Sequence, residues 1–148
     1  KGKERKRRAK LTKKKIDITK NVAKLLEARP EVAAAYLFGS VAMGMERKGS
    51  DLDVAVLLDG SLSAEQMGQS RFELMDLLEQ AIGREIDLVI LNSASLKLIC
   101  QVLKYGKLAY ATNIDQARSF KLMKQKEYFD FKYYMDRDIQ EMRVFFGS

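Results

Sequence analysis

The stretch covering residues 36–58 constrains this chain more than any other part of its sequence. An apolar run ends at Gly39-Ser40, ten residues follow, and a second apolar run begins with Asp51-Leu52-Asp53. In an extended strand, side chains two residues apart point to the same face. Asp51 and Asp53 are therefore predicted to project together at the start of a strand. Neighbouring carboxylates repel each other unless a cation lies between them, and Mg²⁺ binds through one or two carboxylates plus phosphate oxygens.

The residues between the two predicted strands supply candidate contacts to a nucleotide's phosphates. Gly39 lets the backbone approach a ligand closely. Ser40, at the predicted start of a helical turn, offers a hydroxyl and a backbone N–H to a phosphate. Ser50 is a third candidate for nucleotide binding, although a serine at this place also serves as a turn cap. Both interpretations of Ser50 stay open.

A third carboxylate lies on another β-rich run, residues 85–91, where Asp87 stands near the beginning. If the two strands are neighbours, Asp87 completes a cluster with Asp51 and Asp53. Such a cluster suits phosphoryl or nucleotidyl transfer, in which cations neutralise the triphosphate and a carboxylate accepts the proton of the attacking hydroxyl. Taken singly, Asp87 could merely deter edge pairing, and Ser-Asp is ordinary turn chemistry.

The pattern of Gly39-Ser40, ten residues, Asp51-Leu52-Asp53 and a following strand aspartate, Asp87, resembles the nucleotidyltransferase superfamily that includes DNA polymerase β. More narrowly, it is similar to the minimal nucleotidyltransferase (MNT) domains, over residues 32–111. The resemblance implies an α/β (α+β) fold with a small mixed β-sheet flanked by helices. It also implies ATP as the nucleotide donor and two Mg²⁺ ions.

Composition excludes several other kinds of site. The chain has no histidine, which excludes a Ser-His-Asp triad and any zinc site built on imidazole. Cys100 is the single cysteine, so no internal disulfide can form, and this fits a reducing cytosol. The sequence shows neither an apolar run of membrane-spanning length nor the apolar stretch of a signal peptide. We expect a cytoplasmic protein that does not enter a membrane.

The positive charge is concentrated at the start of the chain. Residues 1–15 contain ten basic side chains and one acidic one, a net charge of +9. The whole chain carries +7, so residues 16–148 carry −2. We expect residues 1–15 to form a basic, disordered arm. Either the arm makes weak, salt-sensitive contacts with nucleic acid, or it only improves solubility.

Hydrophobic periodicity predicts one nucleotidyltransferase domain over residues 16–112. Helices are expected at residues 16–28, 64–82 and from Ser93 or Ser95 to 105, and strands at 32–38, 52–58, 85–91 and 107–112. Ser63 is the expected N-cap of the second helix, and Gly83 and Gly106 are expected to end the second and third. In the second helix, five side chains are predicted to face inward: Met67, Phe72, Met75, Leu78 and Ile82.

Residues 113–148 are predicted to form a long C-terminal helix that packs on the domain, on a partner, or on both. Eight of the thirteen aromatic residues lie here. An apolar stripe recurs at helical spacing, and the simplest prediction is that the helix folds back and buries it. Tyr133, Tyr134 and Phe145 fall outside the stripe and indicate a protein partner, because aromatic side chains are enriched at interfaces.

The small size of the chain and its long final helix also resemble the MNT antitoxins of HEPN/MNT toxin–antitoxin pairs. This resemblance implies transfer of AMP from ATP to a tyrosine hydroxyl of a HEPN ribonuclease toxin. Three alternatives stay open at this point. They are a binding-only antitoxin with a vestigial acidic site, a nucleotidyltransferase acting on a small molecule, and a nucleic-acid-associated protein acting through residues 1–15.

Overall fold

A computed structural model describes residues 18–39 and 51–145. Residues 18–27 form a helix, and the remaining helices are α3 (Ala64–Ile82), the 3₁₀ turn η1 (Leu91–Ser93), α4 (Leu96–Tyr105) and α5 (Ile114–Phe145). The strands are β1 (Val32–Phe38), β2 (Leu52–Leu58), β3 (Ile86–Ile90) and β4 (Lys107–Ala111). The expected mixed sheet flanked by helices is confirmed.

The four strands form one mixed sheet in the order β3-β2-β1-β4. The central pair β1 and β2 is antiparallel, β4 is antiparallel to β1, and β3 is parallel to β2. The parallel pair follows from the crossover through α3, since a parallel connection needs a long segment and a helix supplies it. The parallel pairing puts the starts of β2 and β3 at the same edge of the sheet.

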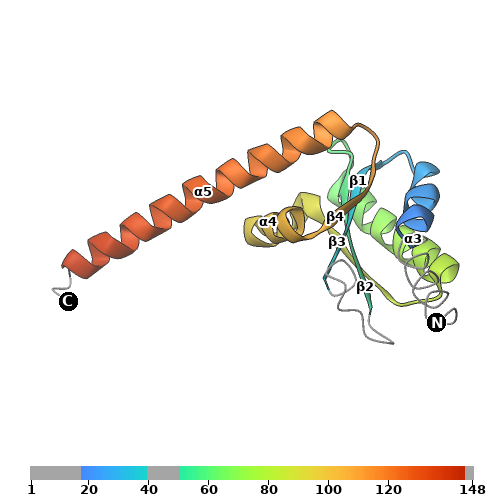
Figure 1. Cartoon of the computed structure of the whole chain (residues 1–148), viewed down its shortest axis with the longest axis horizontal. Coiled ribbons are helices and arrows are strands. Elements are labelled where there is room, and N and C mark those ends of the chain that lie inside the picture. The colour runs from blue at the N-terminus through green and yellow to red at the C-terminus, as the bar shows by residue number, and fades with distance from the viewer. Residues whose placement is uncertain (1–17, 40–50, 146–148) are drawn as a thin grey trace, which may run out of the picture.

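Helices cover both faces of this sheet (Figure 1). On one face, the helix at 18–27 and α3 pack against strand residues such as Val54 and Leu88. On the other face, α4 packs through Ile99, Val102 and Leu103 against the alternate strand positions. Central strands buried on both sides have near-continuous apolar sequences, as β1 and β2 do.

Local sequence signals set the ends of the helices. Ser63 caps α3 with a reciprocal capping box involving Gln66, and Gly83 ends the helix in the left-handed conformation. Ser95, one of the two predicted caps, accepts a hydrogen bond from the backbone N–H of Leu98 at the start of α4. One prediction for α3 is wrong: Phe72 does not face inward and is 72% exposed.

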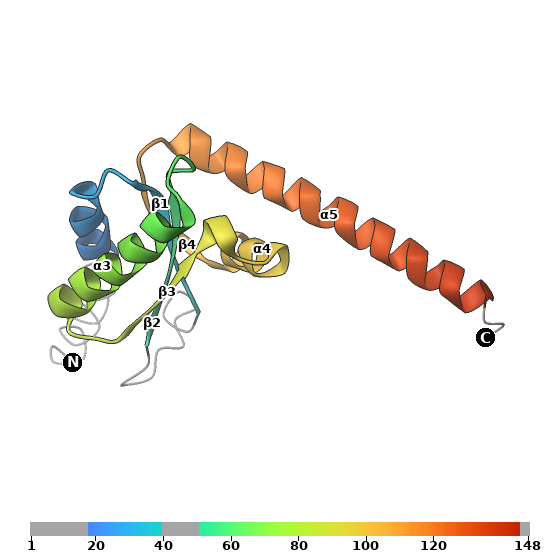
Figure 2. The ribbon, with the colours of Figure 1, turned by 180° about the vertical axis from the view of Figure 1, so that it is seen from behind.

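Helix α5 does not fold back over the sheet (Figures 1 and 2). Its first turns contact the domain, where Ala117 is buried and Phe120 packs beside α4. Beyond them the helix runs away from the domain, and its stripe is exposed, for example at Phe131 and Met135. The prediction that the domain buries the stripe is therefore wrong. In the part of the chain that the structure describes, no helix is long and apolar enough to cross a membrane.

Candidate functional site

The parallel pairing of β2 and β3 brings two of the predicted carboxylates side by side. Asp53 is in register with Asp87. Both alternate with residues that pack under α3, namely Leu52 and Val54 in β2 and Ile86 and Leu88 in β3. Their side chains therefore lie on the opposite face, which α4 covers. Asp51, exposed and directly before β2, belongs to the same set by its position two residues before Asp53.

The electrostatics of Asp53 indicate a site with excess negative charge. Its pKa is raised above the ordinary value of 3.8, first by burial, then by the charge of Asp87 and a hydrogen bond shared with it, and lastly by the charge of Asp51. Two carboxyl groups share a hydrogen bond only when one of them holds a proton. Asp53 is thus acted on by both neighbouring carboxylates, and a cation would relieve this repulsion.

Gly39 lies beside the carboxylate of Asp53 in this site. It follows β1, whose last residue, Phe38, pairs with Asp53. The backbone of Gly39 has φ +75°, and a Cβ atom there would overlap Oδ2 of Asp53. The position thus requires glycine for two reasons: the backbone is left-handed, and the carboxylate of Asp53 approaches too closely for a side chain. The predicted role of Gly39, a close approach of its backbone to a nucleotide phosphate, stays a prediction.

The donor set fits Mg²⁺ in its chemistry, because carboxylate oxygens are the protein ligands that this ion prefers. Among residues 18–39 and 51–145, no group of three His, Cys, Asp or Glu side chains is gathered closely enough to hold a metal ion. Asp53 and Asp87 are in contact, whereas Asp51 acts on Asp53 through its charge. The structure therefore brings Asp53 and Asp87 together as a pair, with Asp51 nearby as a third carboxylate.

Two of the predicted nucleotide contacts, Ser40 and Ser50, lie outside the described residues, as does the segment between them. Gly106 is predicted from the sequence only as the end of a helix. The structure gives it a second role, because a Cβ on Gly106 would lie 3.1 Å from the carbonyl oxygen of Leu37 and 3.4 Å from Cβ of Phe38. The end of α4 is thus packed against the residues that precede Gly39, and no local sequence signal indicated this contact.

Comparison with known proteins gives relatives for this fold. A curated relative, the protein adenylyltransferase MntA of Shewanella oneidensis, is 38% identical over 86 residues. That match covers 58% of this chain and 59% of the relative's length.

Solved structures of similar proteins extend the likeness. One is a toxin–antitoxin crystal structure with AMP-PNP; it is 32% identical, with a TM-score of 0.64, covering 80% of this chain and 93% of the other. Another contains a tri-AMPylated Shewanella oneidensis HEPN toxin in complex with an MNT antitoxin; the matched chain is 27% identical, with a TM-score of 0.65 and coverage of 86% and 98%.

A family model described as polymerase beta, nucleotidyltransferase, matches residues 20–115. The match begins in the first helix and ends at the start of α5, so it includes the whole sheet and all three candidate carboxylates. With the paired aspartates on adjacent parallel strands and the glycine pressed against them, the conclusion is direct: this chain belongs to the polymerase β nucleotidyltransferase family.

Proposed function

We propose that this chain transfers AMP from ATP to a hydroxyl group of a partner protein, a tyrosine of a HEPN ribonuclease toxin, and so silences the toxin. The family supplies nucleotidyl transfer as the reaction type. The relative MntA is a protein adenylyltransferase, and a similar antitoxin was crystallised with an AMPylated HEPN toxin. The ATP analogue in another related complex supports ATP as the donor.

One observation carries this proposal: the contact between Asp53 and Asp87, with Gly39 closing on Asp53 from the neighbouring strand. Two adjacent carboxylates, here half-buried Asp53 and exposed Asp87, repel each other and destabilise a fold unless a cation compensates them. At the same point stands a glycine with a left-handed backbone, where a Cβ would overlap the Asp53 carboxylate. Features of this kind cluster at functional sites. Together they favour a functional site over a polar strand end that has no function.

The proposed roles of the residues follow from their chemistry. Asp51, Asp53 and Asp87 are the residues that would hold Mg²⁺, which when bound neutralises the triphosphate and the leaving diphosphate. The backbone at Gly39 and the hydroxyls of Ser40 and Ser50 would contact the phosphates.

In the reaction, the acceptor oxygen forms a bond to the α-phosphorus of ATP while the bond from that phosphorus to the bridging oxygen breaks. Diphosphate leaves, and Asp87 accepts the proton of the acceptor hydroxyl. No covalent intermediate with this chain is needed.

A binding-only antitoxin is the competing function, and the exposed apolar face of α5 favours it. Such a surface fits a partner whether or not AMP is transferred. In that case the chain would neutralise the toxin by covering it, and the acidic pair would be dispensable.

The Asp53→Asn variant separates the two functions. With ATP labelled at the α-phosphate, Mg²⁺ and a purified HEPN partner, the variant should lose at least about a hundredfold of the transfer rate, because removal of one ligand charge weakens both metal binding and transition-state neutralisation. Asp76→Asn, on the exposed face of α3, should transfer at the wild-type rate. Toxin neutralisation by an Asp53→Asn chain that binds the partner normally would favour the binding-only function instead.

A further inference from the structure

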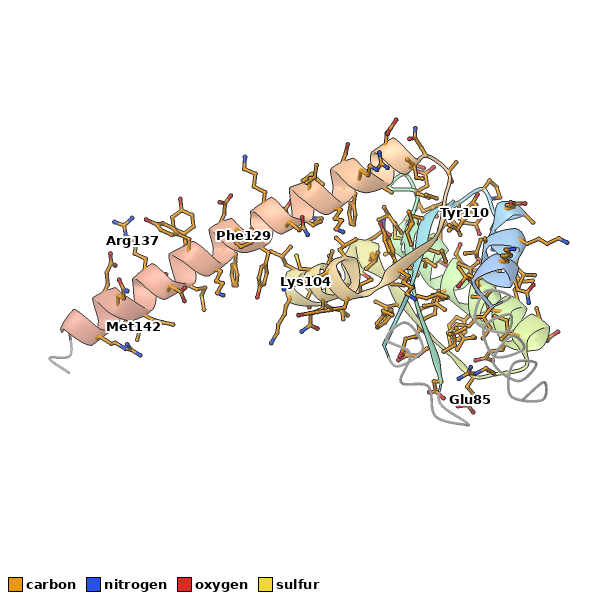
Figure 3. All side chains as sticks on the ribbon, viewed as in Figure 1. Glu85, Lys104, Tyr110, Phe129, Arg137 and Met142 are labelled. Carbon is orange, nitrogen blue, oxygen red and sulfur yellow. The ribbon has the colours of Figure 1, made fainter. Side chains whose placement is uncertain are left out.

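A groove of about 450 Å³ lies between α4 and α5. A hydrogen bond from Sγ of Cys100 to the carbonyl oxygen of Lys124, 3.4 Å long, joins the two helices beside it. Figure 3 shows Lys104 and Phe129 on the two walls of this groove. The volume lies in the range typical of small-ligand sites. The groove is also on the same face of the sheet as Asp53 and Asp87, because α4 covers that face.

The lining of the groove is positively charged. Lys97 and Lys104 come from α4 and Lys132 from α5, and none of the lining residues is Asp or Glu. Next to the groove, Glu127 is paired with Lys124 at 3.3 Å, so its charge is offset there. A lining with three ammonium groups and no acid favours a ligand with several negative charges.

Aromatic rings and amides make up most of the remaining lining. Tyr105 and Phe129 are 57% and 69% exposed, so their rings are available to a ligand, and Tyr128, which also lines the groove, is half-buried. The Nζ of Lys104 lies 5.3 Å from the centre of the Tyr105 ring. Gln101 and Gln125 add side-chain amides, which can pair with the polar edge of a base.

This composition differs from that of the outer part of α5. No Leu, Ile, Val or Met side chain lines the groove, whereas Met135, Ile139 and Met142 are exposed farther along the helix. Aliphatic and thioether groups suit a protein partner. Lysines interleaved with exposed rings suit the phosphates and bases of a single-stranded nucleotide chain.

The groove adjoins the catalytic face through a short series of contacts. Tyr105 is followed by Gly106, whose backbone packs against Leu37 and Phe38, and Phe38 precedes Gly39. Gly39 in turn touches Asp53. One end of the groove therefore lies next to the strand that supports the candidate active site.

We propose that the groove between α4 and α5 binds a short single-stranded nucleotide chain, with bases stacked on Tyr105, Tyr128 and Phe129 and phosphates held by the three lysines. The ligand chemistry is the same for free RNA and for AMP units attached to an acceptor protein. This site goes beyond AMP transfer and does not depend on it, because the groove residues are separate from the three carboxylates.

Binding of a fluorescent, 5′-phosphorylated triadenylate to the full chain in EDTA, followed by anisotropy, tests the proposal. Phe129→Ala should weaken binding at least about fivefold, the loss expected for one stacked base. Phe72→Ala, which removes an equally exposed ring from α3, should bind as the wild type does. Neither change alters the charge, so attraction by the basic residues 1–15 is the same in both variants.

A second pair of variants tests the lysines. Lys104→Glu/Lys132→Glu should weaken triadenylate binding about tenfold or more at low salt, whereas Lys20→Glu/Lys24→Glu, with the same net charge, should lose clearly less. An acidic peptide of the same charge as the triadenylate should not respond to Phe129→Ala. The proposal is overturned if the Phe129 and Phe72 variants bind triadenylate equally, or if the acidic peptide loses affinity in the Phe129 variant as the triadenylate does. A free triadenylate that binds far more weakly than an AMPylated acceptor would identify the acceptor-attached chain as the source of the ligand.

Discussion

At the scale of single residues, the candidate site depends on the close approach of the Asp53 carboxylate to Gly39. Gly39 and Gly83 have the same backbone φ of 75°, but only Gly39 has a neighbour where its Cβ would be. The two positions therefore separate backbone strain from steric overlap with Asp53.

Alanine at each glycine gives a prediction. Gly83→Ala should lower the free energy of unfolding by about 1–2 kcal/mol, the penalty of a left-handed backbone for a residue with a Cβ, and leave AMP transfer unchanged. Gly39→Ala should add displacement of the Asp53 carboxylate and reduce transfer by at least about a hundredfold. Chemical denaturation and the labelled-ATP assay measure the two effects. Equal activity of the two variants would contradict a tight fit between Gly39 and Asp53.

The raised pKa of Asp53 predicts that the site destabilises the unliganded fold. Because the pKa in the folded protein lies above the ordinary value of 3.8, the stability from this group is largest below pH 3.8 and is lost as the pH rises through the folded-state pKa. In EDTA at neutral pH, Asp53→Asn should therefore melt at a higher temperature than the wild type, and the difference should vanish in acid. Mg²⁺ should raise the melting temperature of the wild type more than that of the variant. A variant that melts lower than the wild type at neutral pH would refute this account of the carboxylate pair.

At the scale of elements, the sequence predicted β1 and β2 to the residue and α3 with its cap, because turn and cap residues bound each apolar run. Phe72 was wrongly assigned to the inward face, whereas Leu74, which was not assigned to it, is buried. Phe72 lies about 140° around the helix from Met67 at 100° per residue. The inward position at that level belongs to Arg71, whose Nε donates to the carbonyl oxygen of Leu88 at 3.1 Å.

The candidate site was only partly predictable, because part of its geometry is local to one strand and part depends on how the strands pack. The spacing of Asp51 and Asp53 fixed which side chains share a face, since that is a local property of a strand. Contact between Asp53 and Asp87 required β3 to lie parallel to β2 and in register, which depends on the crossover and on packing under α3. The groove between α4 and α5 could not be found from sequence, because its lysines and rings are brought together by the angle between two helices.

At the scale of the whole molecule, the dominant feature is a helix with little to pack against. At 1.5 Å per residue, the 32 residues of α5 span about 48 Å. Its N-terminal half lies along α4, with contacts at Phe120 and Lys124, and its C-terminal half extends away from the domain (Figure 2). An apolar stripe whose exposed members include Met135 at 46% and Ile139 at 44% contributes little to the stability of the isolated chain. Exposed apolar surface of this extent is typical of an interface with another protein.

Substitution of this stripe should separate stability from partner binding. Met135→Gln/Ile139→Gln should leave the free energy of unfolding within about 0.5 kcal/mol of the wild type, because neither side chain is buried by the domain. Leu103→Ala, in the buried face of α4, should lower it by about 2–5 kcal/mol. The double variant should nevertheless lose affinity for the HEPN partner by at least about tenfold while its uptake of Mg²⁺ and ATP is unchanged, as titration calorimetry with each ligand would show. If the double variant instead unfolded more readily and bound the partner normally, the stripe would belong to the core of the free chain and α5 would have to pack against the domain in solution.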